Sequence, residues 1–190
     1  YVARNLEPYR GFHIFMRMLE KVQKAHPRCH VIIVGGDDVS YGSKPKDAAH
    51  WREKMLREVS LDPTRTHFMG RLPREQYLRV LQVSACHVYL TYPFVLSWSL
   101  MEAMSIGCLI VASDTAPVQE HIRHGENGLL VDFFDPQALA NTIAQAIEQR
   151  EQLRELRTAA RSHVVANLDL NGICLPAQID LMSRIVNAPL

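Results

Sequence analysis

The sequence predicts an α/β fold, a doubly wound parallel sheet of the Rossmann-like type, and three observations support this. Helix-like and strand-like segments alternate along the 190 residues with short connections. The strand-like segments are short and apolar, and two of them end at glycine, which is typical of buried parallel strands. The composition, 47% hydrophobic and 22% charged, suits one globular domain spanning residues 1–190.

The first half of the chain supplies most of this alternation. Residues 1–4 have the pattern of a strand end, and residues 11–26 carry apolar side chains at positions 12, 15, 16, 19 and 22, the spacing of one helix face. The elements that follow are a β-branched strand (29–36), a polar loop (37–50), a helix (48–60), a brief strand (66–70) and a helix (73–84) with Pro73 at its first position.

The second half continues the pattern. We expect a strand (85–91), a loop (92–98), a helix (99–106), two strands (108–113 and 128–133), an Asp-Pro helix start (135–149) and two closing helices (151–168 and 175–186). In such folds ligands bind beyond the carboxyl ends of the strands, so the loops after strands are the places to search.

Charge and cysteine content narrow the function classes. A net charge of +1 gives no argument for nucleic acid or an anionic membrane surface. Residues 80–113 carry Glu102 as their one Asp, Glu, Lys or Arg, but Pro93, Gly107 and polar residues interrupt them, which argues against a bilayer span. Four dispersed cysteines favour buried free thiols in a reducing cytoplasm.

The loop after the first strand holds two arginines six positions apart, Arg4 and Arg10. Guanidinium groups pair with phosphate oxygens, and the helix that begins nearby adds N–H donors. The alternative is two solvated surface arginines, with Glu7 free to pair with either of them.

Glu102 has two interpretations. The segment Ser99–Glu102 fits a Ser-x-x-Glu capping box, in which Glu102 reaches back to the backbone of Ser99. Alternatively, Glu102 is a ligand-binding carboxylate near the loop that precedes this helix, whose backbone N–H groups could cradle an anion. The local pattern favours the cap.

Other motifs are weaker. Gly35–Asp38 lacks the dinucleotide-binding glycine pattern, and Gly42–Lys44 lacks the spacing of a P-loop. His121 and His124 have no evident third ligand, so we expect surface histidines and no metal site.

Several segments in order resemble the C-terminal, donor-binding half of group-1 retaining glycosyltransferases of the GT-B architecture. The carriers are the Arg4/Arg10 opening and the segments at residues 30–36, 66–72, 84–94, 100–114 and 126–140. The resemblance implies a sugar transfer with retention, from a nucleotide-diphosphate sugar, without a metal or other cofactor. It also implies that the acceptor site lies in an N-terminal domain outside these residues, on which the helix at 170–190 packs.

The resemblance assigns roles to residues of this chain. Arg4 and Arg10 would contact the donor pyrophosphate and stabilise charge on the departing diphosphate, with Arg10 in place of the family's usual lysine. Glu102 would bind the ribose hydroxyls. The backbone of Gly70, Arg71 and Leu72 would meet the nucleobase, and the loop and helix start at Val95, Leu96, Ser97, Trp98 and Ser99 would face the sugar or phosphate.

One family position departs from the pattern: the glutamate that contacts the donor sugar is Phe94 here. This leaves open a catalytically lapsed nucleotide-binding or interaction module of the same fold, and more distantly a sugar-nucleotide epimerase. The family also implies a fragment inactive alone and peripheral membrane association of the full-length protein.

Overall fold

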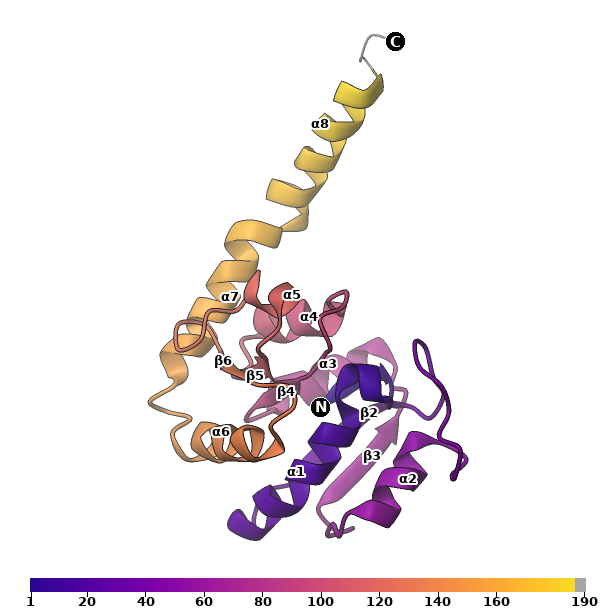
Figure 1. Cartoon of the computed structure of the whole chain (residues 1–190). Helices are drawn as coiled ribbons and strands as arrows, with labels where there is room; N and C mark the ends of the chain where they lie inside the picture. The colour runs from indigo at the N-terminus through magenta and orange to yellow at the C-terminus, as the bar shows by residue number, and fades with distance from the viewer. Residues whose placement is uncertain (187–190) are drawn as a thin grey trace.

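The protein's computed structural model describes residues 1–186, which form an α/β fold (Figure 1). Within that range the strands form two three-stranded parallel sheets, in the orders β1-β2-β3 and β4-β5-β6. The first sheet contains β1 (Val2–Asn5), β2 (Val31–Gly36) and β3 (Thr66–Gly70). The second contains β4 (His87–Tyr89), β5 (Ile110–Ser113) and β6 (Leu129–Val131). The predicted parallel α/β class is confirmed, with the strands divided between two sheets.

Helices cover both faces of the strands, as the doubly wound prediction requires. On one face α1 packs against α2 and α6, and on the other α4 packs against α3 and α7. Figure 1 shows α1 and α6 side by side. The helices are η1 (Pro8–Arg10), α1 (Phe12–Ala25), α2 (Trp51–Glu58), α3 (Arg74–Val83), α4 (Trp98–Ile106), α5 (Ala116–Gln119), α6 (Pro136–Glu148), α7 (Arg154–Leu168), η2 (Leu170–Cys174) and α8 (Leu175–Val186).

The side chains of the second sheet alternate between two hydrophobic cores. Val88 and Val111 pack in the core that includes α1 and α6, whereas Tyr89 and Ile110 pack in the core that includes α4. Successive strand residues point to opposite faces, so a strand that is apolar at every position must be buried on both. The continuous apolar runs in the sequence therefore reflect this double burial.

Several predicted helix starts differ from the structure: those at residues 11, 73 and 99 by one residue, and those at residues 48 and 151 by three. Pro73 has extended backbone and precedes α3, which begins at Arg74. α4 begins at Trp98, because Ser97 is its N-cap and accepts a hydrogen bond from the backbone of Ser99. The predicted start of α6 is confirmed: Asp135 caps it through bonds from the backbone N–H groups of residues 137 and 138 at 2.9 and 2.8 Å.

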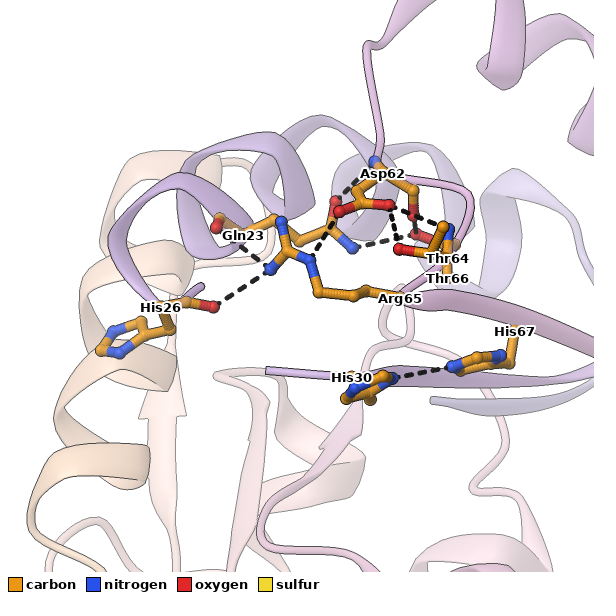
Figure 2. A network of polar contacts seen from close by, with 8 residues as sticks. All are labelled: Gln23, His26, His30, Asp62, Thr64, Arg65, Thr66 and His67. Carbon is orange, nitrogen blue, oxygen red and sulfur yellow. Dashed lines mark hydrogen bonds and ion pairs between the residues drawn. The ribbon is translucent and has the colours of Figure 1, made fainter. Parts of the chain in front are cut away.

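A polar network fastens the end of the first sheet that lies opposite the strands' carboxyl ends (Figure 2). Arg65 donates to the carbonyls of Gln23 and His26 at the C-terminus of α1, where a cation is favoured. Asp62 accepts from Arg65 at 2.8 Å and from Thr64. The hydrogen bonds from Thr64 and Arg65 lower the pKa of Asp62 to about 2. The network holds α1 to β3 and leaves the opposite ends of the strands free for a site.

The C-terminal segment leads away from the sheets. α7 and α8 follow one another in a long rod, and the rod's far end stands clear of the body (Figure 1). The helix predicted at 170–190 is present to Val186, and residues 187–190 lie outside the described residues. Apolar side chains of α8, including Ile179, Met182 and Ile185, are exposed.

Two composition-based predictions can be compared with the structure. No helix within residues 1–186 combines the length and apolar content needed to cross a membrane. The four cysteines are free thiols, but only Cys108 is buried; Cys29, Cys86 and Cys174 are partly exposed. Cys29 and Cys86 still pack against the core.

Gly11 provides a test of the packing between α1 and the second sheet. Its φ of 68° is left-handed, and a Cβ there would meet Leu90 and come within 3.1 Å of the Phe133 ring. We expect Gly11→Ala to lower the free energy of unfolding by about 3 kcal/mol, from backbone strain and overpacking together. Urea denaturation measures this.

Gly125 is the matched control, since its φ is 77° and a Cβ there would meet nothing within 4 Å. Gly125→Ala should lower the free energy of unfolding by about 1 kcal/mol, from backbone strain alone. Equal costs at the two positions would contradict the proposed close contact.

Candidate functional site

The candidate site is a polar hollow at the carboxyl ends of β1, β2 and β3. It has a volume of about 540 Å³ and is bounded by residues from the end of β1 and from the loops after β2 and β3: Arg4, Asn5, Asp38, Val39, Ser40, Tyr41, Lys44 and Arg71. Three of these side chains are cationic and one is a carboxylate. An excess of positive charge in a concave site attracts anions.

A second hollow of about 320 Å³ adjoins the first, and Arg4 and Arg71 line both. Its other walls include Gly35 and Leu72. Gly70 ends β3 with a left-handed φ of 63°, which turns the chain toward Arg71. The structure thus brings together four of the residues predicted from the sequence, Arg4 and the segment Gly70–Leu72.

The guanidinium of Arg71 is positioned by Asn5. Its Nη2 donates to Asn5 Oδ1 at 2.9 Å and lies 3.4 Å from Asp38 Oδ2. A Cβ at residue 36 would approach Arg71 Nε to 2.7 Å and Asn5 Oδ1 to 2.8 Å, so any other residue there would displace this pair from its present position. Gly36 therefore allows Arg71 to lie against the end of β2.

Arg10 is buried, at 8% exposure, which rules out the alternative of two solvated arginines. Its Nη1 donates to Thr91 Oγ1 and to the carbonyl of Val95, both at 3.0 Å. The rings of Tyr41 and Phe94 lie 5.5 Å from its guanidinium carbon. Arg10 is thus bound to the loop after β4 and covered by two aromatic rings, an arrangement that favours a cation.

The loop after β4 holds the other predicted positions. The backbone N–H of Ser97 donates to Tyr89 Oη at 2.7 Å, and burial raises the pKa of that phenol. Ser99 is buried in the first turn of α4. By contrast, Val95 and Trp98 are 70% and 84% exposed, so the loop presents apolar surface beside its anchored backbone.

The capping-box interpretation of Glu102 is wrong. Ser99 is inside the helix, and the Glu102 carboxylate instead accepts from Arg74 Nη1 at 2.7 Å and Tyr77 Oη at 2.8 Å. The pKa of Tyr77 is raised, mainly by burial and secondly by the hydrogen bond to Glu102. Glu102 therefore faces α3, whose first residue, Arg74, is two positions after Leu72 at the edge of the second hollow.

The weaker motifs have other partners. Asp37 pairs with Arg52 at 2.5 Å. His124 accepts a backbone hydrogen bond from Leu130, and His121 contacts His163. Within residues 1–186, no three His, Cys, Asp or Glu side chains are placed to hold a metal ion.

Sequence reasoning missed the residues that complete the hollow and hold its loops. Lys44 and Tyr41 belong to a polar loop with no recognisable motif, and only its position after β2 pointed to it. Glu7 was open to pairing with either Arg4 or Arg10, but its carboxylate accepts backbone N–H bonds from residues 40–42.

Comparison with known proteins agrees with this geometry. In solved structures, the fold matches that of Anabaena HepE in complex with UDP, with a TM-score of 0.78 at 23% identity over 96% of this chain and 48% of that one. It also matches a sucrose-phosphate synthase from Thermosynechococcus elongatus, with a TM-score of 0.81 at 21% identity over 98% of this chain and 45% of that one. The fold is that of the Rossmann-like C-terminal domains of GT-B glycosyltransferases.

Curated relatives match at the level of sequence. A putative glycosyltransferase of Bacillus subtilis, YtcC, is 25% identical over 86% of this chain and 40% of its own length. A phosphatidyl-myo-inositol mannosyltransferase of Mycobacterium tuberculosis is 27% identical over 89% of this chain and 42% of its own length. The chain therefore spans less than half the length of these relatives.

The family described as glycosyl transferases group 1 matches residues 1–163, from β1 into α7. That range contains every residue of the hollows. The chain belongs to the group 1 glycosyltransferase family.

Proposed function

We propose that this chain binds the donor of a retaining glycosyltransferase, a nucleotide-diphosphate sugar. The observation that carries the proposal is the cationic hollow at the carboxyl ends of β1–β3, lined by Arg4, Lys44 and Arg71. A diphosphate is a dense anion, and guanidinium groups at a strand end match its oxygens. HepE, whose fold this chain shares, is described in complex with UDP and with UDP-glucose.

The two hollows suggest an order for the parts of the donor. The nucleobase would occupy the smaller hollow, against the backbone of Arg71 and Leu72, and the diphosphate the larger one beside Arg4. Glu102 would accept hydrogen bonds from the ribose hydroxyls, because a carboxylate offers more acceptor positions than Arg74 and Tyr77 occupy.

In sugar transfer, negative charge grows on the departing diphosphate. Fixed cations placed where that charge develops lower the activation barrier for sugar transfer. We assign this role to Arg4, an exposed cation in the larger hollow. Arg10 lines neither hollow and would act from behind the Tyr41 ring, which lines the larger one, while the loop after β4 holds its Nη1. This step needs no metal or other cofactor in the proposed mechanism.

A second candidate function is a nucleotide-binding or interaction module without transfer activity. Phe94 favours it, because the ring at this position covers Arg10 and offers no carboxylate to a sugar. Transfer and binding-only functions predict the same nucleotide site, so they are separated by assaying transfer of the donor sugar by the longer protein that includes the acceptor-binding part proposed below.

We further propose that the acceptor binds to a part of a longer protein outside these residues, and that the chain alone does not catalyse transfer. The coverage of the relatives supports this, since this chain matches about 40% of their length. The exposed apolar side chains of α8 would pack on that part. We keep the cytoplasm as the proposed compartment, supported by four free thiols; peripheral membrane association would depend on the absent part.

The proposal is tested by calorimetric titration with UDP, GDP and ADP and with their nucleosides. For whichever nucleoside diphosphate binds, Arg4→Ala should lower the affinity by ~10–100-fold, which corresponds to the loss of a charge-assisted hydrogen bond. The affinity for the nucleoside should change little. Arg28→Ala is the control, since Arg28 is exposed on the connection that leads into β2, at the opposite end of the strand. Equal losses for diphosphate and nucleoside would contradict the pyrophosphate role, and no binding at millimolar concentration would contradict the function.

Glu102 provides a separate test of the ribose role. Glu102→Gln removes the charge and one acceptor, so nucleoside affinity should fall ~10-fold. Glu120→Gln, at an exposed position, should leave it unchanged. Unaltered nucleoside affinity in Glu102→Gln would contradict the ribose role and leave Glu102 with a structural role, through its contacts with Arg74 and Tyr77.

A further inference from the structure

The Glu7 carboxylate is buried, at 1% exposure, and its partners are backbone N–H groups. It accepts from Ser40 at 3.1 Å, Tyr41 at 3.1 Å and Gly42 at 3.0 Å. Consecutive N–H groups that converge in this way form a concave anion-binding turn. A buried carboxylate is stable only when such partners satisfy it, so the turn at residues 40–42 and Glu7 fix one another.

A second bond fastens the same loop from the other side. Asn5 Nδ2 donates to Ser40 Oγ at 2.8 Å, while Asn5 Oδ1 accepts from Arg71. Asn5 is buried as well. The loop after β2 and the guanidinium of Arg71 are therefore held to the end of β1 by two adjacent anchors, Asn5 and Glu7.

Lys44 lies two residues beyond the anchored turn and lines the hollow with Arg4 and Arg71. The hollow's carboxylate, Asp38, lies against Arg71. Arg10, in contrast, is covered by aromatic rings and uses its Nη1 on the loop after β4. The cation that supplements Arg4 in the open hollow is thus supplied by the loop after β2.

We propose that Glu7 is a positioning residue, which holds the turn at residues 40–42 so that Lys44 joins Arg4 and Arg71 in binding the diphosphate of the donor. This inference rests on the proposed function. The lysine ammonium acts as a point charge, which complements the directional guanidinium groups on either side.

The first experiment compares affinities for a nucleoside diphosphate and for its nucleoside by calorimetry. The probe is whichever of UDP, GDP or ADP the unmodified protein binds. Lys44→Ala should lower the affinity for the diphosphate ~10-fold and leave the affinity for the nucleoside within twofold, because only the diphosphate carries charge at this position. Lys44→Arg should restore most of the affinity.

Lys46→Ala is the matched control: both lysines line a hollow beside Trp51, but of the two only Lys44 also lines the candidate site. It should change neither affinity. A diphosphate that binds equally to the unmodified protein and to Lys44→Ala overturns this inference and leaves the proposed function intact. Absence of diphosphate binding to the unmodified protein overturns both.

The positioning role is tested by Glu7→Gln, which keeps the size of the side chain but replaces an acceptor with an N–H₂ group facing donors. Diphosphate affinity should fall about as far as in Lys44→Ala, and nucleoside affinity should hold. In the double variant, the loss of diphosphate-binding free energy should be much smaller than the sum of the losses in the two single variants, since both act through Lys44.

Fully additive losses overturn the positioning role. If Glu7→Gln does not fold, Ser40→Ala tests the same turn by removing the Oγ that Asn5 binds. It should shift diphosphate affinity in the same direction, and an unchanged affinity counts against the inference.

Discussion

The fold of the site depends on two opposite charges buried in one turn, Glu7 and Arg10. Their carboxylate and guanidinium each bind a different loop: Glu7 holds residues 40–42 after β2, and Arg10 holds Thr91 and the carbonyl of Val95 after β4. A buried charge without partners costs several kcal/mol. Burial of Glu7 and of Arg10 therefore stabilises the loop conformation that supplies the hydrogen-bond partners of each. The turn after β1 therefore positions both loops, and the hollow lies between the end of β1, the loop that Glu7 holds, and Arg71 after β3.

The sequence was sufficient for the elements of the fold and for part of the site. Parallel strands buried on both faces show themselves as apolar runs, and glycines mark where strands end, so the α/β class and the site's edge of the sheet follow from local patterns. The direction of Arg10 does not, since it is set by contacts with residues about 80 positions away. The pairing of Glu102 was likewise hidden, because Tyr77 and Arg74 approach from another helix.

Phe94 changes the chemistry of the site more than the replacement of one side chain indicates. The family resemblance expects a carboxylate there, which would pair with a nearby cation. The ring instead lies against Arg10 and 4.8 Å from the Tyr41 ring, which also contacts the hollow. Aromatic faces stabilise a guanidinium without neutralising it. The local charge is therefore more positive than a glutamate would leave it, which suits an anion and removes a partner for sugar hydroxyls.

The decisive measurement is a crystal structure of the protein soaked with a nucleoside diphosphate. We predict phosphate oxygens within hydrogen-bond distance of Arg4 and Lys44, with the base against Arg71 and Leu72. We also predict that Glu7 still accepts from the backbone of residues 40–42 in the complex. A nucleotide bound away from this hollow, or one whose phosphates contact neither Arg4 nor Lys44, would contradict the proposed donor site.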